Sequence, residues 1–373
     1  MQGEELAKVG ETSIASATIP CHQGNGSGQG FSIRYNFPRA PISKHANPLG
    51  MKTHRYENSH EEMRASSVTQ RLACALCGSR DAQPVLEKRI DGPGAALPFL
   101  LWRCAACGLV RTEPQLAPRE LEAYYAEEYW GGIEAADSNW IRRDQRYRTG
   151  FLCRFRGEGS VLDVGCGLGF FLRALDPKRW DRYGIEPMPF PYREAAHSLG
   201  ADRVLNTELI AAGLPSGKFD VVTFWDSLEH LPNPRAVLQE VGRLLRPGGI
   251  ILIGLPNFGG YQAHHFGDDW FGLSLPHHLC HYTRETLTRL LDGCGFSVRV
   301  MEDRSGPENY HALKHSLLKR LTRLHGPRGG RLRYYSVKPF LHPWEWISTR
   351  WGGGSSLQVC AERVSAEAAG FFN

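Results

Sequence analysis

A glycine-rich turn follows an apolar run near the middle of the chain, in the stretch 161–169. Its glycines are Gly165, Gly167 and Gly169, and Asp163 lies two residues before the first of them. Alternate glycines let a backbone turn pack closely against a ligand. A dinucleotide-binding turn needs its third glycine one position later, where this chain has Phe170, and an aspartate beside the turn favours a positively charged ligand over a pyrophosphate. The motif predicts a nucleotide-type cofactor pocket.

The segments after this turn alternate between strand and helix. Glu186 lies about 20 positions after the turn, where an acidic residue usually binds ribose hydroxyls. Phe219 to Trp225 is a short apolar run led by an aspartate, as expected of a buried parallel strand. The helical pattern that follows stops at a Pro-Gly-Gly sequence, and a strand is predicted at once from Ile250 to Leu255. This order predicts an α/β domain.

The chain resembles the class I S-adenosylmethionine-dependent methyltransferases, roughly over residues 150–363. The resemblance rests on three features together: the acidic glycine turn, the acid after the second strand and the Pro-Gly-Gly stop. The resemblance implies a Rossmann-like, seven-stranded methyltransferase sheet. Its last strand, here Ser356–Val364, would run antiparallel, inserted beside its predecessor, Phe296–Glu302. It also implies cofactor contacts by position: Asp163, Gly165, Gly167 and Glu186, with Asn206 and Thr207 near the adenine and Asp226 near the methionine end.

Four cysteines upstream form two matched pairs, Cys74 with Cys77 and Cys104 with Cys107, each in a Cys-x-x-Cys-Gly sequence. The pairs are separated by 26 residues, and each glycine lets the backbone turn beneath the sulfurs. Four thiolates at this spacing close a tetrahedral zinc site without an open position, so we predict a structural zinc in a small N-terminal zinc ribbon. Two disulfides in a secreted protein are the alternative, which the sequence disfavours because it shows no signal peptide before the pairs.

Histidines at two places are candidates for a general base, which removes a proton when the acceptor is a hydroxyl or an acidic carbon. His230 directly follows Glu229 after the predicted fourth strand, at the edge where ligands bind in open α/β sheets. His278 and His281 belong to a Pro-x-His-Leu-x-His segment, which borders the acceptor site in methyltransferases of similar sequence. His277 replaces an arginine that is common there, so the acceptor preference does not carry over.

Asp226, Glu229 and His230 also resemble the acidic, acidic, histidine pattern of the ubiquinone-pathway O-methyltransferases, some of which bind magnesium there. Such an ion would lower the pKa of an acceptor hydroxyl. The same Glu-His pair is widespread in the superfamily without a metal, where it orients the turn after the strand. The sequence leaves both interpretations open.

Composition and pattern divide the chain into parts. We expect a disordered extension over 1–68, a zinc-ribbon module over 69–113, an aromatic-rich helical linker over 114–150, a methyltransferase domain over 151–364 and a tail over 365–373. The linker aromatics are Tyr124, Tyr125, Tyr129 and Trp130, which would either cover the cofactor or fill a seam between domains.

An insertion at 303–355 interrupts the methyltransferase pattern and carries most of the net charge of +5. Residues 311–350 contain nine lysines and arginines against Glu345 alone. Leucines recur there at helical spacing (Leu313, Leu317, Leu318, Leu321 and Leu324), with Trp344, Trp346 and Trp351 nearby. Such a basic amphipathic segment suits a membrane surface, an anionic substrate or RNA, or else forms a solvated face over a packed stripe.

These expectations together predict a cytoplasmic enzyme that transfers a methyl group from S-adenosylmethionine to a small molecule. O-methylation is favoured over C-methylation, and the acceptor would be an envelope glycan, a natural product or a quinone-like compound. A zinc-containing ribosomal RNA methyltransferase is one alternative, with nucleic acid held by the basic insertion. A non-catalytic protein that has kept the cofactor pocket is the other.

Overall fold

The computed structural model describes residues 72–90, 97–116, 120–121, 124, 138–303, 307–350 and 354–364. The predicted disordered segment 1–68, the tail 365–373 and three linker aromatics, Tyr125, Tyr129 and Trp130, lie outside these residues. Every described residue from Ala73 onward belongs to one compact unit. Within the described ranges, no helix is long and apolar enough to cross a membrane.

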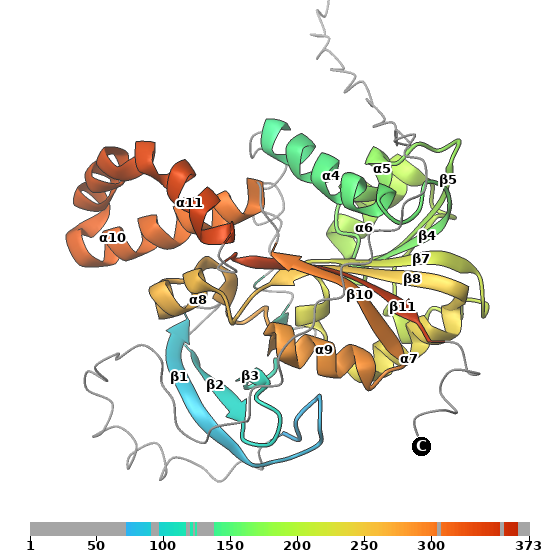
Figure 1. The fold of residues 1–373 in the computed structure, drawn as a ribbon, viewed down its shortest axis with the longest axis horizontal. Coiled ribbons are helices and arrows are strands. Elements are labelled where there is room, and N and C mark those ends of the chain that lie inside the picture. The colour runs from blue at the N-terminus through green and yellow to red at the C-terminus, as the bar shows by residue number, and fades with distance from the viewer. Residues whose placement is uncertain are drawn as a thin grey trace, which may run out of the picture. The chain divides into compact units, whose positions relative to one another are not determined.

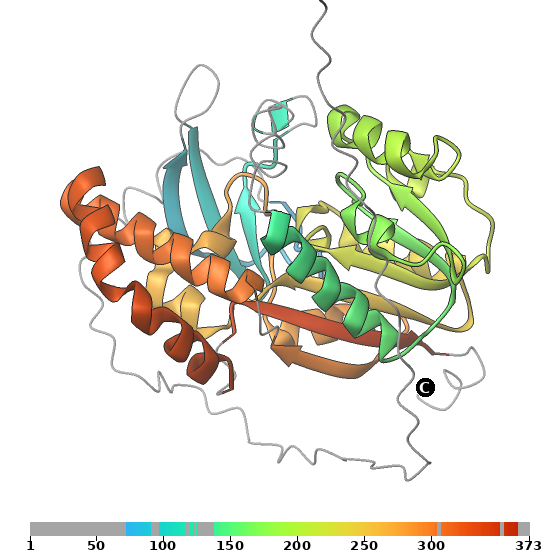
Figure 2. The same cartoon turned by 90° about the horizontal axis from the view of Figure 1, so that it is seen from above.

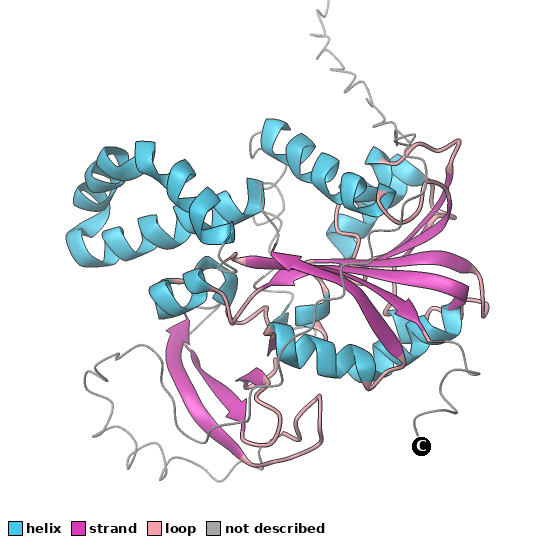
Figure 3. Ribbon diagram, in the orientation of Figure 1, coloured by secondary structure: helices cyan, strands magenta, loops and turns pink. Residues whose placement is uncertain are grey.

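A seven-stranded sheet forms the larger part, in the order β10-β11-β8-β7-β4-β5-β6 (Figures 1 and 3). Its strands β4 to β8 pair in parallel, and β11 is inserted antiparallel between β8 and β10, so the predicted fold is confirmed. The strands are β4 (Gly159–Val164), β5 (Trp180–Ile185), β6 (Val204–Leu205), β7 (Phe219–Trp225), β8 (Leu245–Pro256), β10 (Phe296–Asp303) and β11 (Ser356–Arg363). β8 begins before the predicted Ile250 because Leu245 already pairs with Phe219.

Helices cover both faces of this sheet, because successive strand residues point to opposite sides and both sides are apolar (Figure 1). α4 (Ser138–Cys153), α5 (Phe170–Ala174) and α6 (Pro189–Leu199) pack on the face that includes Val161. α7 (Pro234–Leu244) and α9 (Arg284–Asp292) pack on the face that includes Leu162. The parallel strands therefore direct all their carboxyl ends, and the turns that follow them, to one edge.

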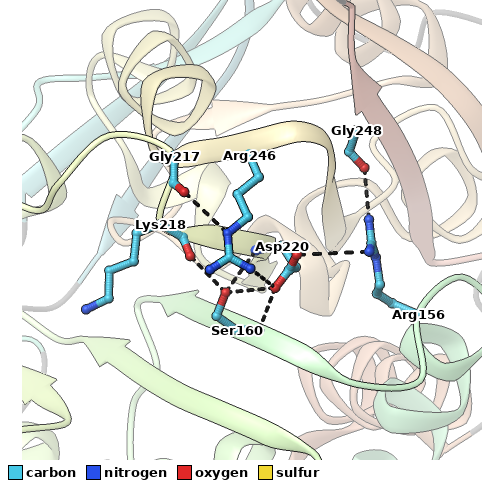
Figure 4. Close-up of polar contacts among 7 residues, drawn as sticks. All are labelled: Arg156, Ser160, Gly217, Lys218, Asp220, Arg246 and Gly248. Carbon is cyan, nitrogen blue, oxygen red and sulfur yellow. Dashed lines mark hydrogen bonds and ion pairs between the residues drawn. The ribbon is translucent and has the colours of Figure 1, made fainter.

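A polar cluster holds the opposite edge, at the amino ends of β4 and β7 (Figure 4). Asp220 accepts hydrogen bonds from the amide and hydroxyl of Ser160, at 2.8 and 2.9 Å, and pairs with Arg246 at 2.9 Å. Burial acts to raise the pKa of Asp220, but these contacts outweigh it and hold the pKa below its usual range. A cavity of about 590 Å³ lies beside this cluster, and none of the predicted cofactor residues lines it.

The cysteine pairs belong to a second, antiparallel sheet in the order β1-β2-β3-β9. β1 (Ala82–Ile90), β2 (Leu97–Cys104) and β3 (Val110–Glu113) come from the predicted zinc-ribbon module, called here the cysteine module. β9 (Cys280–His281) comes from the downstream histidine segment, where His281 pairs with Val110 and Cys280 with Arg111. The histidine segment thus completes the sheet of the cysteine module.

The insertion is helical, with α10 (Pro307–Val337) and α11 (Leu341–Arg350) side by side (Figure 2). α10 is broken at Gly326, where φ is 71°. Four leucines of the predicted stripe pack in a third core with α8 (Tyr261–Phe266), as does Trp344. Leu324 is 57% exposed instead, because the helix breaks two residues later. The side chain of Trp346 and all of Trp351 lie outside the described part.

Candidate functional site

The glycine turn lies between β4 and α5 and depends on its glycines. Gly165 has a φ of 73°, and a Cβ there would lie 2.7 Å from Cβ of Ser227. The amides of Gly165 and Cys166 both donate to the carbonyl of Ile185, at 2.8 and 3.0 Å. A side chain at position 165 would therefore clash while the backbone is tied to β5. Gly167 also has a positive φ, 54°, which glycine alone adopts without strain.

Glu186, at the end of β5, braces this turn from the side. Its carboxylate accepts the amides of Gly167 and Met188, each at 2.9 Å. Burial raises the pKa of Glu186 to about 7, although these two hydrogen bonds act to lower it. A carboxylate has about four acceptor positions, so two remain for a ligand such as a ribose. Asn206 braces the same strand end by donating to the carbonyls of Glu186 and Pro187, at 2.9 and 3.0 Å.

Asp163 lies beneath the turn and is 2% exposed. It accepts a 2.7 Å hydrogen bond from the Thr223 hydroxyl on β7. Burial raises the pKa of Asp163 to about 6, while Thr223 and the Arg148 charge act to lower it. At neutral pH the group is therefore mostly ionised, and it places a negative charge beneath the turn. Thr207 is partly exposed beyond β6, next to Asn206 in the chain.

Asp226 follows β7 in a left-handed conformation, with a φ of 56°. Its Oδ2 lies 2.8 Å from Nη2 of Arg148, whose Nε lies 2.7 Å from Oδ2 of Asp144. Burial acts to lower the pKa of Arg148, but the charges of Asp144 and Asp226 raise it above its usual value. Sequence reasoning missed Arg148, because α4 fell within the predicted linker. The spacing of four residues between Asp144 and Arg148 could have indicated this ion pair on a helix.

His230 and His278 meet at the same edge, with ring centroids 4.8 Å apart. Nδ1 of His278 donates to the Gly272 carbonyl at 2.8 Å, so in the neutral ring Nε2 carries the lone pair. Burial, helped by the neighbouring His281, lowers the pKa of His278 to about 3. Burial also lowers the pKa of His230 well below its usual value. Both rings are therefore neutral at pH 7, the form that can accept a proton.

His281 is separated from this pair and faces the cysteine module. Its Nε2 lies 2.9 Å from the hydroxyl oxygen of Thr112 on β3. That hydroxyl donates its single proton to the carbonyl of His278 at 2.7 Å, so it must accept the Nε2 proton of His281. The Thr112 amide also donates to the Leu279 carbonyl at 3.0 Å. The structure thus brings two of the three predicted histidines, His230 and His278, together. The third, His281, is buried and bonds Thr112 of the cysteine module.

Glu229 completes a cluster with the two histidines, whose ligand atoms and a Glu229 oxygen all lie within 4.8 Å of one another. Glu229 is 2% exposed, neither of its carboxylate oxygens has a hydrogen-bond partner, and burial raises its pKa well above the usual value. Asp226 is not part of this cluster. One carboxylate and two imidazoles suit a first-row transition metal, whereas magnesium prefers oxygen ligands. The residues gathered here therefore do not fit the magnesium ion implied by the resemblance.

The four predicted zinc ligands lie together in the cysteine module. Sγ of Cys74 is 3.5 Å from that of Cys107, Sγ of Cys77 is 3.5 Å from that of Cys104, and all four sulfurs lie within 4.8 Å. These separations far exceed a disulfide bond of about 2.05 Å. They approach the edge of about 3.8 Å that zinc–sulfur bonds of about 2.3 Å give a tetrahedron. The four thiols therefore fit a zinc ion.

Known proteins and protein families are similar to the central part of the chain. Residues 140–299 match the family model described as a methyltransferase domain. The matched residues include the glycine turn and the histidine pair, but neither the cysteine module nor the insertion.

Curated relatives match the same region. The ubiquinone biosynthesis O-methyltransferase of Pectobacterium atrosepticum is 32% identical over 143 residues, 34% of this chain and 59% of that protein. The enzyme of the same name from Pseudomonas paraeruginosa is 36% identical over 104 residues, 26% of this chain and 44% of that protein. The chain thus spans about half the length of the curated relatives it matches. A solved SAM-dependent methyltransferase from Thermotoga maritima has a TM-score of 0.43 and 14% identity, over 64% of this chain and 96% of that chain.

The cysteine module and the turn after β7 hold the histidine segment between them. On one side, Thr112 binds the backbone of His278 and Leu279. On the other side, the Leu279 amide donates to the Glu229 carbonyl at 2.8 Å. Sequence reasoning also missed Thr112, because no local pattern marks a hydroxyl that serves a segment 166 residues away.

Replacing Thr112 by valine should lower the free energy of unfolding by about 1–3 kcal/mol, because the His278 carbonyl and the His281 ring lose their buried partner. Denaturant titration measures this loss, and the His281 ring proton should exchange faster with solvent in NMR spectra. Thr288→Val is the control, because that hydroxyl bonds only within α9, to the Arg284 carbonyl. Equal stability and equal ring-proton exchange in the two variants would contradict the support role.

Proposed function

We propose that this protein transfers a methyl group from S-adenosylmethionine to a small-molecule acceptor, with O-methylation favoured. One observation supports the proposal most strongly. The glycine turn, which Glu186 holds by a hydrogen bond, and the neutral histidine pair both follow the carboxyl ends of strands in one parallel sheet. The names of the curated relatives support oxygen as the atom methylated. Envelope glycans, natural products and quinone-like compounds are the proposed acceptor classes.

The residues at the turn match the parts of this cofactor. Glu186 has acceptor positions left for ribose hydroxyls, and Asn206 and Thr207 follow β6 on the side proposed for the adenine. Asp226 and Arg148 offer one anion and one cation, which suits the ammonium and carboxylate of the methionine part. S-adenosylmethionine supplies an electrophilic methyl group on a sulfonium, and the charge of Asp163 favours a cation at this edge.

The remaining task of the chain is to orient the acceptor and remove its proton. His230 is partly exposed, and its ring is held by a hydrogen bond to the His277 backbone. We propose that His230 contacts the acceptor. His278 carries its lone pair on Nε2, 3.9 Å from the Glu229 carboxyl, and we propose that it lies beside His230 as a second group able to take up the acceptor proton. His281 positions His278 and does not take part in the chemistry.

A labelling experiment tests the proposed function directly. The full chain is incubated with methyl-labelled S-adenosylmethionine and a size-fractionated bacterial extract, and label should enter small molecules or glycans. Label in ribosomal RNA would replace the proposal by an RNA methyltransferase. Absence of label, despite tight cofactor binding in calorimetry, would replace it by a non-catalytic binding protein.

Replacing Glu186 by glutamine should weaken cofactor binding about 10- to 150-fold, because a charged acceptor for ribose contributes about 1.5–3 kcal/mol. The affinity of the unaltered chain should fall as the pH drops through about 7, the raised pKa of Glu186, since protonation removes the charged acceptor. Glu186→Gln should lack this pH dependence. Calorimetric titrations on both sides of that pH measure both effects.

Asp181→Asn is the control for this variant, because Asp181 lies on the same strand but is 51% exposed. Equal cofactor affinity in the two variants would remove Glu186 from the ribose site.

We further propose that residues 69–113 hold one structural zinc ion, that a linker begins at residue 114, and that the catalytic domain comprises 151–364 together with α4, which packs on its sheet although it fell largely within the expected linker 114–150. A cytoplasmic location fits, because reducing conditions keep the four thiols free to bind metal. For the basic residues of 311–350 we propose an anionic partner, with nucleic acid less favoured.

Replacing Cys77 by serine should release the zinc, as measured by atomic absorption on the full chain. Cofactor affinity should stay largely intact, whereas methyl transfer should fall because β3 no longer supports the histidine segment. Cys294→Ser is the matched control, because Cys294 lies outside the four-cysteine group. An unaltered zinc content in the Cys77 variant would refute the four-cysteine site.

A further inference from the structure

Exposed apolar side chains gather at one end of the α10 and α11 pair. Within the described residues, five of the ten large hydrophobic side chains that are exposed lie between 324 and 340, here called the tip segment. They are Leu324, Leu332, Tyr335, Val337 and Phe340, with exposed fractions of 57, 73, 64, 38 and 71%. Scattered exposed hydrophobic residues are ordinary, but a cluster of this kind marks a surface that another body covers.

The tip segment exposes these five side chains although residues within and beside it are buried. Tyr334 and Leu341 are buried in the third hydrophobic core, at 5 and 6% exposure. Gly330 is also buried, and a Cβ there would lie 2.7 Å from the backbone of Thr322. These contacts fix the second limb of α10 against the first. The neighbouring apolar side chains are therefore exposed on a packed support, the α10 and α11 pair that Figures 1 and 2 show as ribbons.

Positive charge is interleaved with these apolar residues. Arg328, Arg331, Arg333 and Lys338 are all exposed, and none has a carboxylate partner among the described residues. No aspartate or glutamate occurs between 309 and 344. Arg320 and Arg323, closer to the core, both pair with Asp269 instead. The uncompensated charge is therefore concentrated in the same segment as the exposed apolar side chains.

We propose that the tip segment docks on the surface of an anionic phospholipid membrane. The apolar side chains would enter the boundary between head groups and acyl chains, and the four cations would pair with lipid phosphates. The inference deepens the proposed function, in that it rests on the anionic partner proposed for the insertion, and it holds whichever acceptor is methylated. The tip segment lies outside residues 140–299, so the matched methyltransferase domain does not supply it.

The side-chain types favour lipid over RNA. Single-stranded RNA is held by cations together with aromatic rings on which bases stack. Tyr335 and Phe340 could stack on bases, but Leu324, Leu332 and Val337 offer no ring, and burying such aliphatic side chains is favourable at an acyl boundary. Opposite charge alone would suit either partner, but the combination of aliphatic exposure and free cations suits a membrane.

Cosedimentation of the full chain with vesicles tests the proposal. The chain should bind vesicles of phosphatidylcholine mixed with phosphatidylglycerol, bind pure phosphatidylcholine far less, and dissociate as salt is raised. A Leu332→Ser, Phe340→Ser double variant should lose at least about tenfold in partition, since about 0.8 kcal/mol is lost per buried CH₂. An Arg331→Gln, Arg333→Gln variant should lose about fivefold per cation, from about 1 kcal/mol each.

The matched control is Ile210→Ser with Val85→Ser, which removes two exposed apolar side chains outside the insertion, at 55 and 39% exposure. Equal vesicle binding by the tip and control variants would overturn the proposal. So would a tip-dependent dimer in sedimentation velocity without vesicle binding, which would make the segment an interface between copies, or tip-dependent binding of RNA alone. Cofactor affinity, measured on the same samples, should be unchanged in every variant, so failure of the docking surface is distinguishable from failure of the methyltransferase proposal.

Discussion

The hydrogen bonds of Thr112 hold the histidine side of the candidate site in place. They fix the backbone of His278 and Leu279, and Leu279 in turn bonds the turn that carries Glu229. Thr112 lies on β3, a strand of four residues that depends on its neighbours for its position. Those neighbours are β2 and β9, and the second cysteine knuckle joins β2 to β3. A metal bound at the knuckles would therefore influence the histidine segment through the backbone.

The edge that carries the glycine turn concentrates buried acids. Asp163, Glu186 and Glu229 are each at most 5% exposed, and burial raises the pKa of all three. Burying carboxylates is unfavourable for folding unless charges or donors compensate for it. Arg148 compensates in part, and a cationic ligand rich in hydroxyl donors would compensate further. The site is thus built to favour such a ligand over water.

Local patterns carried most of what the sequence could predict. The glycine turn, Glu186 and the cysteine pairs are each defined within a few residues, and the structure places them close to where those patterns indicate. Contacts between distant segments were not predictable. His278 and His281 lie three residues apart in one motif, yet pairing of β9 with β3 turns them to different neighbours. Thr112 was missed because its partner lies 166 residues away, and Arg148 was missed because α4 fell within the predicted linker while its second partner, Asp226, lies 78 residues away.

The insertion lies between the two strands of a hairpin, β10 and β11, so it need not disturb the pairing of the sheet. β10 and β11 are adjacent and antiparallel, and their ladder closes with Asp303 opposite Leu357. Beside this open end of the hairpin, the backbone amide of Asn257 donates to the carbonyl of Ser355 at 2.8 Å. Since the entropy of closing a loop grows only with the logarithm of its length, lengthening this hairpin costs the sheet little. The open end of the hairpin can therefore carry a long helical insertion while the register of β8, β10 and β11 stays unaltered.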